Sequence, residues 1–229
     1  MTNRPVALVT GATRGIGRAI AVELSSTHRI LVGGRDAARA GELVAELDDA
    51  APFVCDLADE DAVAAACAGI GRLDVLVHSA GIGRSDDIGA ASRALWREVF
   101  ETNVFAVADL TRLLLPALEA ARGIVVAINS GAGFFSSPGG GVYAGSKFAL
   151  RALTDALREE MRGKVRVCSI HPGRTDTDMQ RELQAAMGNE HYNGSCYVSP
   201  GSVAAAVRLA VDTPDNATVE QLSIRPSVF

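Results

Sequence analysis

The chain has 229 residues, 48% of them hydrophobic and 21% charged, and carries a formal net charge of -5. We expect one globular α/β domain spanning residues 1–229, with no membrane span because no apolar run is long enough, and no nucleic-acid partner because there is no basic run. Four cysteines without CxxC spacing and four scattered histidines predict reduced core thiols and no metal site, and the lack of a signal-peptide pattern predicts a cytoplasmic protein.

The first predicted element is a buried parallel strand, Val6–Thr10, which runs into a glycine-rich turn. Gly11, Gly15 and Gly17 have the spacing GxxxGxG, and an amphipathic helix begins at Arg18. Glycine adopts backbone angles that other residues avoid, and it lets a pyrophosphate approach the free N–H groups of a helix N-terminus. The turn therefore predicts a phosphate-binding site, with a purely structural turn as the alternative.

Strands and helices alternate along the rest of the chain, which predicts a parallel, doubly wound sheet with helices on both faces. The further strands are expected at Ile30–Gly33, Phe53–Cys55, Leu73–Val77, Gly123–Asn129, Val165–Ile170 and Val219–Ile224. The further helices are expected at Ala37–Leu47, after Asp59 to about Ala68, at Ser92 to about Ala121 as one helix or two, through Phe148 to Met161, and at Ser202–Val211. Pro116 predicts a break or kink in the longest helix, and residues 174–199 show no clear periodicity.

Tyr143 and Lys147 stand four residues apart where the helix after the fifth strand begins. Residues at i and i+4 face the same way on a helix, so the ammonium can lie beside the phenol. Lys147 is one of only two lysines, and the other basic residues are arginine. Lysine is a compact, tunable point charge that arginine cannot imitate, so its use here points to chemistry. Taken alone, the pair could also be a surface lysine beside a half-buried tyrosine.

These motifs resemble the short-chain dehydrogenase/reductase family, in its single-domain branch with a Thr-Gly-x-x-x-Gly-x-Gly turn and a Tyr-x-x-x-Lys pair. The resemblance covers nearly the whole chain and implies a Rossmann-like sheet of about seven strands. It implies a catalytic group of Asn103, Ser130, Tyr143 and Lys147. The cofactor contacts that it implies are Gly11, Thr13, Arg14, Gly15, Ile16, Gly17, Arg35, Asp56, Leu57, Ser79, Ala80, Gly81, Asn103, Tyr143, Lys147, Pro172, Gly173, Thr175 and Thr177.

The resemblance implies hydride transfer between a nicotinamide and a carbonyl or secondary alcohol. Tyr143 would be the general acid/base, with its pKa lowered from about 10 by the Lys147 ammonium and the charge of the oxidised nicotinamide. Lys147 would also bind the ribose, and Ser130 would donate to the substrate oxygen. Asn103 would hold a water that links Lys147 to solvent. The alternative function is a non-catalytic NADP(H)-binding redox sensor, but the presence of all four residues favours the enzyme.

Several of these residues also have structural interpretations. Asn103 could merely satisfy backbone groups, Ser130 could cap a strand end, and Asp56 could be a turn residue. The dipeptide His78-Ser79 departs from the two asparagines of the family, which leaves its contact with the cofactor open.

The residues after the second strand predict NADP(H) rather than NAD(H). An NAD enzyme places an acid at this position to bind the ribose 2′-hydroxyl, and that acid would repel a 2′-phosphate. Here Gly34 and Arg35 follow the strand, and Arg14 lies within the glycine turn. The two arginines could clamp a phosphate with charge-assisted hydrogen bonds. Asp36 as the ribose acid is the alternative, although a helix cap is its simpler role.

The substrate is expected to be a small carbonyl or hydroxy compound, bound by loops that carry little pattern. The expected pocket comprises Phe134, Phe135 and residues 82–84 and 178–199, with packing as the alternative role of the two phenylalanines. Arg84 and Arg174 admit a carboxylate-binding interpretation or a solvated surface role. The C-terminal residues 219–226 resemble those of NADP-dependent 3-hydroxy acid dehydrogenases of the family.

The helices at about 92–121 and 144–162 are apolar over more than one face. Such helices need another partner to cover them. Family members commonly pair these helices, which predicts a homo-oligomer, either a tetramer or a dimer.

Overall fold

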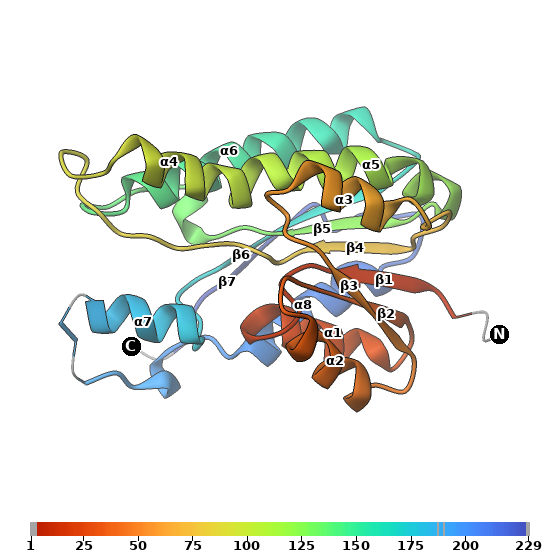
Figure 1. Cartoon of the computed structure of the whole chain (residues 1–229), viewed down its shortest axis with the longest axis horizontal. Helices are drawn as coiled ribbons and strands as arrows, with labels where there is room; N and C mark the ends of the chain where they lie inside the picture. Colours follow the sequence, from red (N-terminus) through yellow and green to blue (C-terminus); the bar gives the residue numbers. More distant parts are fainter. Residues whose placement is uncertain (1–3, 187, 190, 228–229) are drawn as a thin grey trace.

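A sheet of seven parallel strands forms the centre of the computed structural model, which describes residues 4–186, 188–189 and 191–227. The strands lie in the order β3-β2-β1-β4-β5-β6-β7 (Figure 1). They are β1 (Val6–Val9), β2 (Arg29–Gly34), β3 (Ala50–Val54), β4 (Val75–His78), β5 (Ile124–Ile128), β6 (Arg166–Pro172) and β7 (Gln221–Ile224). The chain reverses its direction across the sheet between β1 and β4, and ligands bind in the crevice at such a point.

Helices cover both faces of the sheet, which confirms the predicted doubly wound fold (Figure 1). One layer contains α1 (Gly15–Ser25), α2 (Ala37–Glu46) and α8 (Pro200–Asp212). The other contains α3 (Glu60–Cys67), α4 (Arg93–Phe100), α5 (Ala106–Ala121) and α6 (Gly141–Glu160). Because both faces are covered, the central strands are continuous apolar runs rather than alternating ones.

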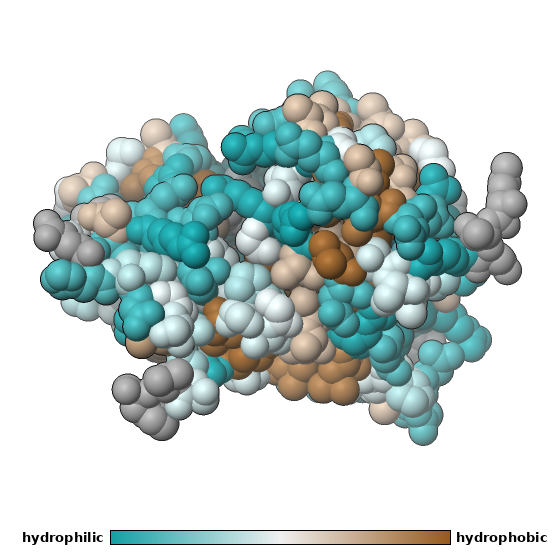
Figure 2. Space-filling view, turned by 90° about the horizontal axis from the view of Figure 1, so that it is seen from below, coloured by the Kyte–Doolittle hydropathy of each residue, from teal (hydrophilic) through white to brown (hydrophobic). Residues whose placement is uncertain are grey.

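The strand side chains divide between two hydrophobic clusters. Ala7 and Val9 point toward the α1 and α8 layer, whereas Leu8 points toward α3 and α5. On α5, Leu110, Leu114 and Leu118 repeat every four residues and are buried. Burial of each such side chain contributes about 1.5–3 kcal/mol. The outer surface of the α1, α2 and α8 layer, seen in Figure 2, is mostly hydrophilic, with hydrophobic residues gathered over part of it.

Side chains cap the N-termini of several helices as the sequence predicts. Asp36 accepts hydrogen bonds from the backbone N–H groups of Ala38 and Arg39, and Asp59 accepts one from Ala62. The Asp36 side chain therefore caps α2, which is the simpler of the two roles considered for it.

Two segments of the chain differ from the prediction. Helix α5 continues through Pro116 to Ala121 without the break that was one of the two predicted effects; a proline removes one helical hydrogen bond, and the buried face holds the helix on the sheet. The hydrogen bonding changes earlier, in the π-helical segment η1 (Glu101–Phe105) between α4 and α5. Residues 174–199 contain α7 (Asp178–Ala186), which the missing periodicity did not predict, and the 3₁₀ turn η3 (Gly194–Cys196). None of the described helices is long and apolar enough to cross a bilayer.

Candidate active site

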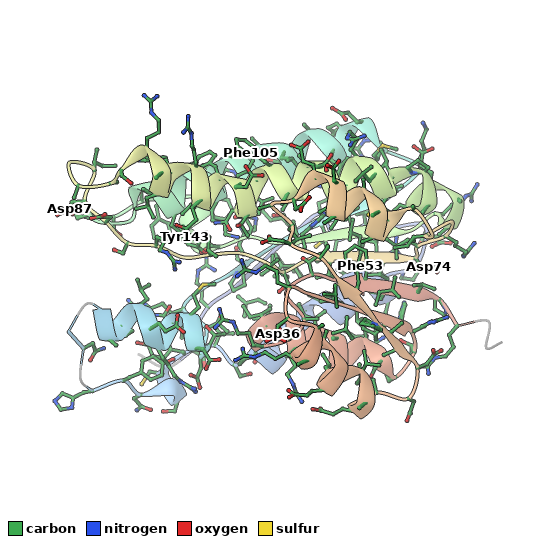
Figure 3. The ribbon with its side chains drawn as sticks, viewed as in Figure 1. Asp36, Phe53, Asp74, Asp87, Phe105 and Tyr143 are labelled. Atoms are coloured by element: carbon green, nitrogen blue, oxygen red, sulfur yellow. The ribbon has the colours of Figure 1, made fainter. Side chains whose placement is uncertain are left out.

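A cleft of about 1010 Å³ opens at the carboxyl ends of the strands. Its walls come from the segments after β4, β5, β6 and β7, from the start of α6 and from α7. In Figure 3, Tyr143 lies at this end of the molecule, between the upper helical layer and α7. The cleft therefore occupies the position that the sheet topology predicts for a ligand.

The glycine turn brings the N-terminus of α1 to the base of the cleft. Gly11 has a φ of +63°, and a Cβ on it would lie 2.8 Å from the Cα of Ala80. A Cβ on Gly17 would lie 2.2 Å from the carbonyl oxygen of Gly11, so the turn and the helix pack without room for a side chain. Arg14 precedes the helix without a side-chain cap, whereas Asp or Ser side chains cap α2, α3, α4 and α8. These open N–H groups fit the phosphates of a dinucleotide.

Thr10, directly after β1, forms hydrogen bonds with the segment that follows β4. Its hydroxyl oxygen accepts hydrogen bonds from the backbone N–H groups of Ser79 (3.0 Å) and Ala80 (3.1 Å). The preceding residue, His78, is buried, and its Nε2 lies 2.9 Å from the hydroxyl of Thr111 on α5. Burial lowers the pKa of His78 to about 4. In place of the asparagines of the family, this chain thus uses a neutral histidine that is directed to α5.

Tyr143, Ser130 and Lys147 converge as predicted. The Tyr143 side chain is half-buried and hydrogen-bonds with the side chain of Ser130. Lys147 is buried, its ammonium lies 5.7 Å from the centre of the Tyr143 ring, and it donates a hydrogen bond of 3.0 Å to the carbonyl of Ile128. Tyr143 and Lys147 both lie in the first two turns of α6, and Ser130 is the second residue after the end of β5.

The protein's own groups raise, rather than lower, the pKa of Tyr143. Burial raises the pKa of Tyr143, and the hydrogen bond with Ser130 only opposes this rise. Burial also lowers the pKa of Lys147 to about 8. The Lys147 ammonium lies 5.7 Å from the centre of the ring, and the loss of water around the ring sets the direction of the pKa shift.

Asn103 lies within the η1 segment, and its side-chain amide forms hydrogen bonds with other residues of the protein. Its oxygen accepts a hydrogen bond of 2.9 Å from the N–H of Ile82, and its nitrogen donates to the Ile82 carbonyl and to the hydroxyl of Ser146. A Cβ on Gly81 would lie 3.2 Å from this oxygen and 3.9 Å from the Lys147 nitrogen. Asn103 therefore braces the loop that lies over Lys147, which matches the structural interpretation of its side chain.

The remaining predicted cofactor contacts separate into two groups. The first group lines the cleft itself and comprises Ile16, Pro172, Gly173, Thr175 and Thr177.

The other group lies in the glycine turn after β1 and in the segments after β2 and β3. Arg35 pairs with Asp56 at 3.8 Å, and Arg14 pairs with Glu182 of α7 at 3.8 Å. Thr13 lies against Gly34, and Leu57 packs against the hydrophobic core. Both arginines are largely exposed, so solvent weakens their ion pairs and leaves them available to another anion.

The structure corrects part of the predicted substrate pocket. Phe135 lines the cleft, but Phe134 instead packs against the imidazole of His171, with ring centres 4.4 Å apart. Arg225, which was not predicted as a site residue, lines the cleft from the end of β7. The signal that could have identified it is its place directly after a strand, the rule that identified the other residues.

Together the fold and the cleft are those of a doubly wound domain with a ligand site at its topological switch point. No group of three or more His, Cys, Asp or Glu side chains suited to a metal ion occurs in the part of the chain that the structure describes. The family model for short chain dehydrogenases matches residues 5–188. The chain belongs to the short-chain dehydrogenase/reductase family, which confirms the resemblance seen in its motifs.

Three relatives illustrate the similarity. Serine 3-dehydrogenase of Agrobacterium fabrum is 33% identical over 233 residues, which cover 96% of this chain and 92% of that protein. The alcohol dehydrogenase of the archaeon Thermococcus sibiricus, solved in complex with 5-hydroxy-NADP, is 27% identical with a TM-score of 0.89, covering 98% of this chain and 97% of that one. A closed form of serine dehydrogenase complexed with NADP⁺ is also 27% identical, with a TM-score of 0.88, covering 96% and 94%.

Proposed function

We propose that the protein is an NADP(H)-dependent oxidoreductase that interconverts a carbonyl group and a secondary alcohol, with residues 1–229 acting as one nucleotide-binding domain. The observation that carries this proposal is the hydrogen-bonded pair of Tyr143 and Ser130, with Lys147 close by, in a cleft that reaches the uncapped N-terminus of α1. All seven strands pair in one sheet, which supports a single domain. Two of the similar structures were solved with NADP⁺ or 5-hydroxy-NADP.

Bound NADPH would supply the hydride to the carbonyl carbon and leave as NADP⁺. Tyr143 then gives its phenolic proton to the carbonyl oxygen, and the product is the alcohol. Ser130 donates a hydrogen bond to the same oxygen as negative charge develops on it. The proton on Tyr143 is then replaced from solvent, so the reaction consumes one proton overall.

Lys147 would bind the nicotinamide ribose through its ammonium, and the acidity of Tyr143 would depend on burial and on the cofactor. Burial raises the pKa of Tyr143, so the protein's own groups keep the phenol protonated and ready to donate. In the reverse direction Tyr143 must accept a proton, which requires a lower pKa. The positive charge of the oxidised nicotinamide would provide that lowering, since an opposite charge favours the phenolate. The oxidation state of the bound nicotinamide would thus set the pKa of Tyr143, high before reduction of a carbonyl and lower before oxidation of an alcohol.

Arg14 and Arg35 support NADP(H) over NAD(H). Arg14 lies in the glycine turn and Arg35 directly follows β2, the placements expected for residues that bind a 2′-phosphate, and each now pairs only weakly with an exposed carboxylate. A 2′-phosphate offers a denser negative charge and several acceptor oxygens. Asp36, the acid that could instead have bound a ribose hydroxyl, is engaged as the cap of α2.

Replacement of Tyr143 by Phe tests the proposal. The change removes the proton donor but keeps the ring, so we expect the rate of NADPH oxidation with a carbonyl substrate to fall by at least about a hundredfold, the contribution of general acid catalysis. Affinity for NADPH, measured by calorimetry, should be retained. Substantial activity in the variant would show that Tyr143 is not the acid. Tight NADPH binding without turnover by the unmodified protein would instead indicate the redox-sensor function.

A further inference from the structure

The cleft around Tyr143 is lined by positive charge, although the chain as a whole is acidic. The formal net charge is -5. Yet the described residues that line the cleft include three arginines, Arg84, Arg174 and Arg225, and no Asp or Glu. A cleft whose charges have one sign focuses the electrostatic field and concentrates ligands of the opposite sign. This asymmetry indicates an anionic ligand.

The three arginines differ in how far their charge is neutralised. Arg84 pairs with Glu98, with 3.1 Å between Nη2 and Oε1, so its charge is already balanced. Arg174 is exposed to the cleft, and its side chain makes no hydrogen bond or ion pair within the described part of the chain. Its guanidinium is therefore free to bind a ligand.

Arg225 is held in place beside the reacting groups. Its Nη1 donates hydrogen bonds to the carbonyl oxygens of His171 (2.6 Å) and Ile224 (3.0 Å). Its Nη2 lies 3.4 Å from where a Cβ on Gly131 would be, and Gly131 directly follows Ser130. Carbonyl oxygens are neutral, so they orient the guanidinium without cancelling its charge. A surface arginine without such anchors would lose more side-chain entropy on binding a ligand.

We propose that Arg174 and Arg225 bind a carboxylate of the substrate, so that the protein acts on hydroxy acids and the corresponding oxo acids. The proposal rests on the function proposed above, because the same cleft carries the reaction. The planar guanidinium matches the two oxygens of a carboxylate, and the resulting hydrogen bonds are charge-assisted. The carboxylate takes no part in the bond changes; it fixes the position of the substrate while hydride and proton are added to the carbonyl group.

A carboxylate is favoured over a phosphate of the cofactor as the anion. The uncapped N-terminus of α1 and the two arginines Arg14 and Arg35 already provide for the phosphates. Arg225 enters the cleft from the other end of the sheet, after β7, beside Gly131. Arg225 thus lies beside the residue that follows Ser130, the serine proposed to donate to the substrate oxygen.

The test compares straight-chain 2- and 3-hydroxy acids with their methyl esters in NADP⁺-dependent oxidation. We expect the unmodified protein to prefer the acids. In Arg174→Gln, kcat/KM for the acids should fall at least about tenfold, the effect of losing one hydrogen bond to a charged group, while that for the esters stays the same. Arg112→Gln, which removes an exposed charge paired with Asp109 on α5, is the matched control. It should change kcat/KM neither for the acids nor for the esters.

Several outcomes would overturn the proposal. Esters oxidised as well as acids, or an equal loss for both in Arg174→Gln, would show that the carboxylate is not recognised. A loss of NADP⁺ affinity in Arg174→Gln, measured by calorimetry, would assign the arginine to the cofactor. Because Arg174 has no side-chain partner within the described residues, its variant should keep the melting temperature of the parent, unlike variants of the anchored Arg225.

A binding measurement separates this proposal from the function on which it rests. If no alcohol is oxidised and no carbonyl is reduced, the proposed function fails. Binding of the hydroxy acids to Tyr143→Phe, with and without Arg174→Gln, is then measured by calorimetry. Binding that requires both the carboxylate and Arg174 supports the anion site. Failure of every acid to bind overturns it.

Discussion

Replacing Lys147 by Met should change the pH dependence of stability in a defined way. Burial lowers the pKa of Lys147 from 10.5 to about 8 in the folded protein. Between these two pH values the unfolded chain holds a proton that the folded chain has lost, so the contribution of this group to stability rises with pH. Below pH 8 the buried ammonium costs the fold roughly 3 kcal/mol, taking about 1.4 kcal/mol for each unit of pKa. Methionine has a similar shape and no charge, so it removes this cost.

The substitution also removes the hydrogen bond from Lys147 to the carbonyl of Ile128, 3.0 Å long. Leaving that buried carbonyl unpaired costs about 1–3 kcal/mol, which offsets much of the gain at neutral pH. The offset changes little with pH, because a neutral amine donates the same hydrogen bond. The clearest signal is therefore the trend with pH rather than the stability at any one pH.

The free energy of unfolding in urea, followed by circular dichroism, measures this trend for both proteins. From pH 7 to pH 10.5, the stability of Lys147→Met relative to the parent should fall by roughly 3 kcal/mol. Groups common to both proteins cancel in the difference. Lys164→Met, at the other lysine of the chain, which is exposed, is the matched control for removing a lysine. A difference that stays constant with pH would refute the reasoning, since it would mean that burial does not disfavour the ammonium.

Two further predictions concern the cofactor and the assembly. Arg14→Ala combined with Arg35→Ala should weaken NADPH binding at least about tenfold and leave NADH nearly unchanged; equal kcat/KM for the two cofactors in the unmodified protein would contradict the assignment. Phe105 (labelled in Figure 3) and Phe148 are exposed by 53% and 39% on the layer of α5 and α6, so light scattering at micromolar concentration should show a tetramer or a dimer, and a monomer would contradict this.

The sequence predicted the strands and the residues that follow them because both signals are local. Apolar runs such as Ile124–Ile128 are buried on both faces, so they predict a parallel strand without any knowledge of the partners. Parallel strands end at the same edge of the sheet, so Ser130 and Tyr143 could be placed together from their positions alone. The same rule, applied to the last strand, would have predicted Arg225.

What the sequence could not predict depends on packing between distant segments. The pKa of Tyr143 depends on how completely the fold removes water from the ring, which no spacing reveals. Helix α7 is only nine residues long, and Met179 and Leu183 are its only large apolar residues, so its amphipathic pattern amounts to a single i, i+4 pair that is hard to recognise in the sequence. The π-helical segment around Asn103 likewise has no local signal, since it depends on the loop at Ile82 that the amide holds.

The wall of the cleft formed by α7 has a consequence for how this protein can evolve. No side chain from Asp178 to Ala185 is fully buried. Substitutions there therefore remove little apolar surface from the core and cost little folding free energy. Met179, Gln180, Leu183 and Gln184 nevertheless line the cleft that would hold the substrate. New substrate preferences can thus arise by mutation in α7 while the sheet, the glycine turn and the Tyr143 site keep their stability.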